Sequence, residues 1–498
     1  MKKTLLHLSE DTLQALTEQE QQLLQEFFAD FRIHCLLNKK EKKRLWEDFE
    51  RAILYYLDGG LSLGEALQRL DVKQLGGFYA RPPVLWFPLD DAAKIYPLSM
   101  GHDKMTMFRL SVTLKKAVVP ELLQMALNFT IKRFPSFATT LKKGVFWHYL
   151  DTNKRRFSVH RESGIPCQPL KVSASGSQSF RVVYWENRIS VEFFHVLTDG
   201  AGGMTFLKVL TAEYLRLTGV SAVPGETLWD CNATPASEEF ENTFTRVPRS
   251  DSASGFVDKI AVQMNGKLSA NKPCRVLHFK MSAAQLKAAA ARCGTTVTVY
   301  LLAQLFLAIR AATDELQGEI SIQVPVNMRK FYPSRTVRNF SMYCGIRLPV
   351  KEIEEAKSLI APILNQLEQK ASKESMSRML TATVRLVGML RCIPLVIKQP
   401  VAKLVYGFLG DKIFTMTFSN LGVVQLPEAL AGEIDGMDFL LGAGSTNRVS
   451  CSMVTINDSA CLSMTKMTVD PSFEEKLYSL LQADGIAVEA EGSELYED

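Results

Sequence analysis

Hydrophobic residues recur at helical spacing along the first 75 residues of the chain. Apolar side chains return every three or four positions over 13–31 and again over 40–57, which is the period of an amphipathic helix. Ser62, followed three residues later by Glu65, matches the capping-box pattern that opens a helix. We therefore expect residues 1–75 to form a helical N-terminal extension.

From residue 76 onward, strand-like and helix-like segments follow one another. Strands are expected where apolar and polar residues alternate, at 107–114, in a hairpin over 180–194, and at 275–281, 319–326, 343–349, 414–418, 451–456 and 461–469. Helices are expected where the apolar period lengthens, at 120–133, 204–217, 283–292, 297–313, 353–373 and within 380–409. The chain is therefore predicted to be an α/β protein.

A polar stretch divides this α/β part into two units. Residues 226–271 are rich in Ser, Thr, Pro, Asn and Gly and carry no sustained period, which is typical of a linker or crossing segment. The sequence predicts one α/β unit at 76–225 and a second at 272–498. The length of 498 residues agrees with about three domain-sized units.

Composition excludes several classes of protein. The chain is 47% hydrophobic and 22% charged, which indicates a folded globular protein and not a disordered, collagen-like or coiled-coil chain. The net charge of +5 is not gathered into a basic stripe interleaved with aromatics, so nucleic acid is not an expected partner. The nine cysteines form no CxxC pair and no zinc-type spacing, so we expect reduced thiols and no metal site.

The lengths of the apolar runs bear on whether the chain crosses a membrane. No uninterrupted run of about 20 apolar residues is present, and the N-terminal apolar run is too short for a signal peptide. We expect a cytoplasmic protein without a transmembrane segment. The apolar stretch 386–409 remains open to three interpretations: a core helix, the lining of an acceptor tunnel, or a segment that rests on a membrane surface.

One short motif points to chemistry. His195 leaves the end of an apolar strand, Asp199 follows four residues later, and a glycine-rich stretch begins at Gly200. A histidine titrates near neutral pH, so it can take a proton from a weak nucleophile. Glycines let the backbone turn sharply near a ligand, and the expected helix after them would favour negative charge at its N-terminus. The alternative from the residues alone is a histidine that caps a strand, followed by a turn.

Further blocks accompany this motif, in the order that one superfamily shows. They are Tyr96-Pro97-Leu98-Ser99, Arg133-Phe134-Pro135-Ser136-Phe137, His195-Val196-Leu197-Thr198-Asp199-Gly200, Val324-Pro325-Val326-Asn327-Met328-Arg329, Arg338-Asn339-Phe340 and Thr417-Phe418-Ser419-Asn420-Leu421-Gly422. Over about 80–470 the chain resembles the CoA-dependent acyltransferase superfamily, which includes chloramphenicol acetyltransferase, plant BAHD acyltransferases and the condensation domains of nonribosomal peptide synthetases. It is most similar to the alcohol acetyltransferase and phthiocerol-acyltransferase-like branch.

The resemblance implies a fold and a reaction. Two chloramphenicol-acetyltransferase-like α/β domains would form a V with a tunnel between them, behind the helical extension. His195 would act as general base within a ternary complex, taking the proton of an alcohol hydroxyl as it attacks an acyl thioester. Acyl-CoA or an acyl carrier protein would be the co-substrate, with no bound cofactor, and the acceptor would be a small-molecule or lipid alcohol.

The resemblance also implies roles for residues in both halves. Asp199 would turn away from His195 and pair with Arg329 of the second half, while Arg335 and Arg338 are rivals for that partnership. Such a pair is structural, because removing one partner leaves a poorly solvated charge.

The remaining candidates concern the backbone and the oxyanion. Gly200 would serve the turn and the contact between the helix and its neighbours. Ser419 and Asn420 would stabilise the tetrahedral oxyanion, or else would belong to a turn that ends a strand. We therefore expect the site to comprise His195, Asp199, Gly200, Arg329, Ser419 and Asn420.

Two other functions stay open. One is a condensation-type N-acyltransferase with a carrier-protein donor, although Phe194 stands where condensation domains usually carry a second histidine. The other is a non-catalytic homologue that binds a partner through 1–75, where the basic cluster at 39–44 is either a solvated helix face or a partner surface. The plant-type DFGWG block is absent.

Overall fold

A computed structural model describes residues 8, 16–79, 86–99, 105–171, 178–253, 259–269, 272–409, 411–442, 444 and 447–496. The described chain opens with α2 (Glu18–His34), α3 (Lys39–Asp58) and α4 (Leu63–Arg69). Thr17 and Ser62 each begin their helix with a capping box, as the sequence predicts for Ser62. The predicted helical extension is thus present over 16–75, while most of 1–15 lies outside the described residues.

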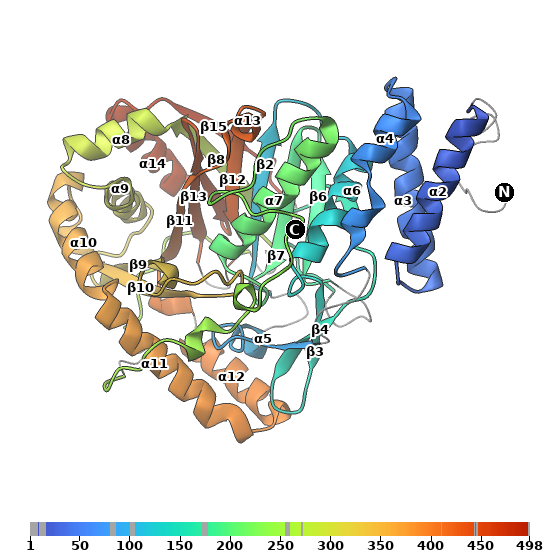
Figure 1. Ribbon diagram of the computed structural model, residues 1–498. Coiled ribbons are helices and arrows are strands. Elements are labelled where there is room, and N and C mark those ends of the chain that lie inside the picture. The colour runs from blue at the N-terminus through green and yellow to red at the C-terminus, as the bar shows by residue number, and fades with distance from the viewer. Residues whose placement is uncertain are drawn as a thin grey trace.

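A five-stranded sheet forms the first half of the molecule, in the order β12-β2-β7-β6-β5. Its strands are β2 (Met107–Leu114), β5 (Val159–Arg161), β6 (Phe180–Trp185), β7 (Arg188–Phe194) and β12 (Ile434–Leu441). Helices α6 (Pro120–Thr130) and α7 (Gly200–Thr218) cover it, and α3 packs beyond α6 (Figure 1). The hairpin predicted over 180–194 is confirmed as β6 and β7.

A seven-stranded sheet forms the second half, in the order β10-β9-β11-β13-β14-β8-β15. Its strands are β8 (Arg275–Ser282), β9 (Glu319–Asn327), β10 (Ser341–Pro349), β11 (Met416–Val424), β13 (Val449–Ile456), β14 (Ser459–Lys466) and β15 (Val488–Gly492). The helices around it are α8 (Ala283–Arg292), α9 (Val297–Ala311), α10 (Ala356–Lys370) and α14 (Ser472–Ala483). They lie on the side of the sheet away from α7 (Figure 1).

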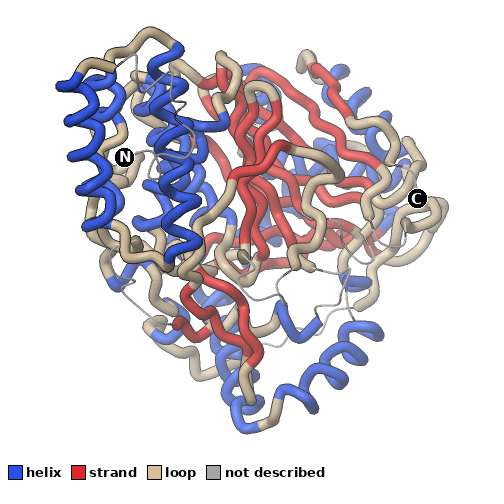
Figure 2. The backbone as a smooth tube through the Cα atoms, turned by 90° about the vertical axis from the view of Figure 1, so that its right-hand side faces the viewer, coloured by secondary structure: helices blue, strands red, loops and turns tan. Residues whose placement is uncertain are grey.

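The remaining elements lie at one end of the molecule. A small sheet of β1 (Trp86–Pro88), β3 (Thr139–Lys143) and β4 (His148–Thr152) has the order β1-β4-β3. Near it are α5 (Tyr96–Ser99), α11 (Lys373–Met389) and α12 (Leu395–Leu409), at the lower end of Figures 1 and 2. The short α13 (Glu428–Ala431) precedes β12.

Three features of the fold differ from the sequence expectations. Helix α7 begins at Gly200, not at 204, because Asp199 caps it. Strand β11 continues to Val424, so the predicted turn after 418 is a bulge within the strand. Strand β12 comes from the C-terminal part of the chain but pairs antiparallel with β2 of the first sheet, with Phe439 opposite Leu110.

The two sheets carry separate hydrophobic cores. One is built mainly from residues up to 231 together with β12 and its neighbours, and the other from residues 244–488. The α/β fold class is therefore confirmed, while the boundaries at 225 and 271 stay predictions. Across the described residues, no single helix is long and apolar enough to cross a membrane, and only α8 with α9, bent by 81°, would meet that criterion as a pair.

Candidate functional site

The N-terminus of α7 is the point where the two halves meet. Asp199 caps this helix, because its Oδ1 accepts a hydrogen bond from the backbone N–H of Gly202 at 3.0 Å. A Cβ on Gly202 would come within 2.0 Å of the carbonyl oxygen of Val337, so only glycine allows this approach. A Cβ on Gly200 would come within 2.7 Å of Leu421 in the β11 bulge. Both glycines thus bring segments of the second half against the helix.

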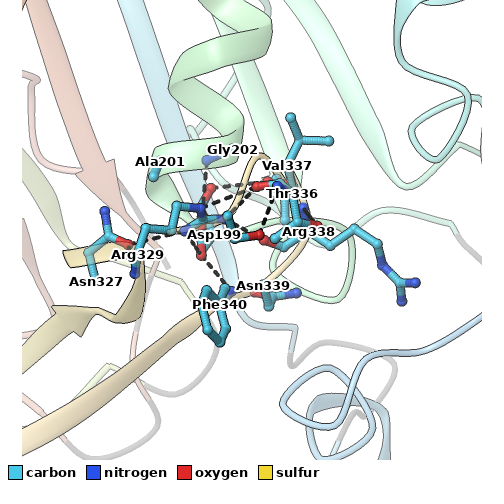
Figure 3. Close-up of polar contacts among 12 residues, drawn as sticks. Asp199, Ala201, Gly202, Asn327, Arg329, Thr336, Val337, Arg338, Asn339 and Phe340 are labelled. Carbon is cyan, nitrogen blue, oxygen red and sulfur yellow. Dashed lines mark hydrogen bonds and ion pairs between the residues drawn. The ribbon is translucent and has the colours of Figure 1, made fainter. Parts of the chain in front are cut away.

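The second oxygen of Asp199 binds the second half directly. Its Oδ2 accepts from Arg329 Nη1 at 2.8 Å and from the backbone N–H of Phe340 at 2.7 Å (Figure 3). Arg329 also donates from Nη2 to the carbonyl oxygens of Thr336 and Arg338, each at 2.8 Å. The ion pair expected between Asp199 and Arg329 is therefore present, and Asp199 does not hydrogen-bond His195.

The two rival arginines have other partners. Arg335 pairs with Glu239 at 3.0 Å and is largely exposed. Arg338 is buried, donates to the carbonyl oxygen of Pro88 at 2.6 Å and lies 3.5 Å from Asp90. Neither of them contacts Asp199.

His195 follows the last residue of β7, and its orientation depends on Asn339. Its Nδ1 lies 2.9 Å from Asn339 Oδ1. The Asn339 amide nitrogen faces acceptors, because the carbonyl oxygen of Val196 lies at 3.5 Å and Asp90 Oδ2 at 3.4 Å. We therefore assign the amide oxygen to the side of His195 and the ring proton to Nδ1. This assignment leaves Nε2 unprotonated.

The surroundings of His195 favour the neutral ring. The Tyr96 ring lies 4.8 Å from the imidazole, and Phe108 contacts it edge-on at 5.2 Å, both measured between ring centroids. Burial lowers the pKa of His195 below its ordinary value of 6.5, because desolvation disfavours the imidazolium. A neutral imidazole with Nε2 unprotonated has the form that a general base requires.

Ser419 and Asn420 lie in β11, where the strand is bulged. The register shifts between Asn420 and Val423, and Gly422 takes φ +75°, which glycine adopts without strain. Asn420 supports this bulge: its Oδ1 accepts from the N–H of Gly422 at 2.8 Å, and its Nδ2 donates to Thr298 of α9 at 3.2 Å. The Ser419 hydroxyl donates no hydrogen bond in the part of the chain that the structure describes.

One large cavity joins these residues. It has a volume of about 2100 Å³ and is lined by residues of both halves. All six predicted site residues line it: His195, Asp199, Gly200, Arg329, Ser419 and Asn420. Helices α11 and α12 and the connection between them add an apolar wall that includes Val387, Leu390 and Ile393. Ligand pockets are more often about 300–1,000 Å³, so there is room for two substrates at once.

Comparisons with known proteins show which solved structures share this fold. No protein-family model matches the sequence, and no curated protein matches it significantly. Among solved structures, trichothecene 15-O-acetyltransferase from Fusarium sporotrichioides matches with a TM-score of 0.54 and 11% identity, over 81% of this chain and 98% of that one. Polyketide synthase associated protein 5 from Mycobacterium tuberculosis matches with a TM-score of 0.52 and 13% identity, over 79% of this chain and 97% of that one. The starter condensation domain of rhizomide synthetase matches with a TM-score of 0.54 and 11% identity, over 80% of this chain and 94% of that one.

The chain has the fold of the CoA-dependent acyltransferases and condensation domains. Within this acyltransferase fold, the cavity lies between the five-stranded and seven-stranded sheets, with β2 and β12 on one side and β9 and β11 on the other. The helices α2 to α4 stand apart from the cavity, beyond α6 (Figure 1).

Sequence reasoning missed Asn339, the residue that hydrogen-bonds His195. Asn339 is 144 positions from His195, and its block appeared only as a point of resemblance without a role. The other described histidines lie elsewhere: His148 is buried in β4 with its pKa lowered by desolvation to about 4, and His278 bonds Ser463 in the seven-stranded sheet. His102 lies outside the described residues. The described residues hold no cluster of His, Cys, Asp and Glu suited to a metal ion.

Proposed function

We propose that this protein is an acyltransferase that moves an acyl group from a thioester, acyl-CoA in the first instance, to an alcohol hydroxyl. The observation that carries the proposal is the 2.9 Å contact of His195 Nδ1 with Asn339 Oδ1, which leaves Nε2 to accept a proton at the wall of a cavity shared by both halves. The fold supports it: one matching structure is F. sporotrichioides TRI101 complexed with coenzyme A and T-2, and the rhizomide domain is described with C8-CoA and Leu-SNAC.

In this proposal the reaction proceeds in one ternary complex. Nε2 of His195 takes the hydroxyl proton as the acceptor oxygen attacks the thioester carbonyl carbon. The tetrahedral intermediate collapses, the carbon–sulfur bond breaks, and the departing thiolate receives the proton from the imidazolium. The acyl group never bonds to the enzyme, and no nucleophilic side chain is required.

The oxyanion is assigned to β11. Ser419 lines the cavity and its hydroxyl donates to none of the described residues, whereas the side chain of Asn420 supports the bulge. We therefore assign Ser419 to the oxyanion and Asn420 to support of the strand. Loss of one such donor costs roughly 10²–10³-fold in rate. Asp199, Gly200 and Arg329 hold the two halves together around the base.

The test is acceptor-dependent release of thiol. Purified protein is mixed with acetyl-, butyryl- and longer acyl-CoA, with and without a panel of alcohols and amines. His195→Ala should lower the rate by about 10²–10⁴-fold, because it removes the general base. His160→Ala, on exposed β5 outside the cavity, is the matched control and should behave as the wild type.

Three results would contradict the proposal. Wild-type rates from His195→Ala would remove the base from the mechanism. If the wild type releases no thiol from any acyl-CoA but turns over an acylated carrier protein with an amine, the condensation-type reaction is favoured. No turnover with either donor would favour a non-catalytic binding homologue. The cytoplasmic location stays a prediction.

A further inference from the structure

Exposed apolar side chains gather at the end of the molecule where α11, α12 and the β3–β4 turn lie. We call this group the apolar end: Val145, Phe146, Leu386, Met389, Val396, Ile397 and Val401, which are 38% to 71% exposed. The backbone N–H of Leu395 donates to the carbonyl oxygen of Val145 at 2.8 Å, which ties the β3–β4 turn to the start of α12. Figure 1 shows these elements together at the lower end. Soluble monomers rarely expose contiguous apolar patches, so this one indicates a contact surface.

The segments that form the apolar end are poor in acidic residues and carry several basic ones. Between Glu374 and Asp411 the chain has no acidic residue, and three exposed arginines lie there: Arg378, Arg385 and Arg391. The β3–β4 segment 139–150 also lacks acidic residues and contains Lys142 and Lys143. An apolar surface flanked by cations is complementary to an anionic lipid surface.

The apolar end is continuous with the cavity. Leu386, Ile397 and Val401 are exposed and also line the cavity, whereas Met389 and Val396 belong only to the outer surface. Trp147 lines the cavity as well, and the Lys398 ammonium lies 3.3 Å from the centroid of its ring. The same two helices thus form part of the cavity wall and part of the exposed surface.

We propose that the apolar end docks on the surface of an anionic lipid membrane, with α11, α12 and the β3–β4 turn at the interface. Apolar side chains would enter the headgroup region while the surrounding arginines and lysines contact anionic headgroups. Docking does not depend on acyl transfer. Only the corollary, that a lipid substrate passes from the membrane into the cavity, rests on the proposed function.

Co-flotation with vesicles tests the proposal on the full chain. Vesicles of phosphatidylcholine alone are compared with vesicles in which about one third of the lipid is phosphatidylglycerol. Wild type should float with the anionic vesicles and lose this binding at high salt. Met389→Glu with Val396→Glu, at positions outside the cavity lining, should weaken binding at least about tenfold. The control is Val223→Glu with Leu316→Glu, which places the same charges at equally exposed apolar positions elsewhere, and it should bind as the wild type.

A second variant addresses the charges without touching apolar side chains. Arg385→Gln with Arg391→Gln should weaken binding to anionic vesicles about tenfold or more and leave weak binding to neutral ones unchanged. The proposal is overturned if the wild type ignores anionic vesicles, or if the Val223 and Leu316 control loses as much binding as the Met389 and Val396 variant. Binding to an acylated carrier protein but not to vesicles would assign the surface to a protein partner instead.

Failure of docking and failure of the proposed function give different results. With acyl-CoA and a short soluble alcohol, the Met389 and Val396 variant should turn over at the wild-type rate. A wild type that binds vesicles but transfers no acyl group would refute the proposed function and leave docking intact. A wild type that is active on soluble alcohols but never binds vesicles would refute docking alone.

Discussion

The polar and the apolar parts of the cavity wall are held in different ways. Around His195 hydrogen bonds hold two polar groups in place: Asn339 binds Nδ1, and Arg329 with two backbone N–H groups binds the carboxylate of Asp199. The wall from α11, α12 and the connection between them has apolar side chains such as Leu390 and Ile393, for which position matters less than volume. The comparison teaches that hydrogen bonds fix the polar side chains of the proposed site, while the apolar wall, to which we assign substrate choice, is held by packing alone.

The largest expected effect concerns the polar part. Arg329→Met should lower the free energy of unfolding by about 3–5 kcal/mol, because it leaves the buried carboxylate of Asp199 without its counter-charge. Arg335→Met is the matched control. Its partner Glu239 keeps Arg133, and Arg335 is 61% exposed, so the loss should stay below about 1 kcal/mol. Urea unfolding of the two variants measures the difference.

A double variant separates the effect of charge from the effect of shape in the Asp199–Arg329 pair. Asp199→Asn combined with Arg329→Met removes both charges and should recover part of the stability lost in Arg329→Met alone. Equal losses in the Arg329 and Arg335 variants would mean that the ion pair does not hold the two halves together.

Local patterns in the sequence predicted much of the fold. The hairpin β6–β7, helix α9 and the strands β8, β9 and β14 all lie within a few residues of their predicted ranges, because their apolar periods are regular. The start of α7 was missed because Gly200, Gly202 and Gly203 are poor helix formers, and the cap at Asp199 outweighs them.

Long-range pairing could not be found in this way. The register that brings Phe439 of β12 opposite Leu110 of β2 joins positions more than three hundred residues apart, and no local period encodes it. The Asp199–Arg329 pair was expected only from the resemblance, and Asn339 received no role because nothing near it in the chain marks it as a partner of His195.

A middle-sized effect is expected at Asn339, which we consider a positioning residue. Asn339→Leu removes the acceptor that fixes the proton on Nδ1, so kcat should fall about tenfold to hundredfold with little change in KM. Wild-type kcat/KM should fall with acid only below pH 6.5, because burial lowers the pKa of His195 and keeps the ring neutral above that pH.

The pH profile of a second substitution sharpens this test. Asn339→Asp places a carboxylate at Nδ1 and should raise the pKa of His195, so the acidic limb of kcat/KM should move to higher pH. A purely structural role for Asn339 would lower the rate without moving that limb, and this outcome would contradict the assignment.

The smallest effect is expected in the apolar wall. Leu390→Trp adds volume inside the cavity, whereas Met389→Trp adds the same volume on the outer surface one residue away. The Leu390 variant should lower kcat/KM for long chains relative to short ones by about tenfold, since each methylene in an apolar pocket is worth ~1–3 kcal/mol. Measuring a series of acyl-CoA donors and, separately, a series of alcohols shows which substrate this wall accommodates. The long-to-short ratio of kcat/KM could stay unchanged for both substrates, or Met389→Trp could change it as much as Leu390→Trp does. Either result would mean that the apolar wall does not select the substrate. The two parts of the cavity wall would then differ only in how their side chains are held in place.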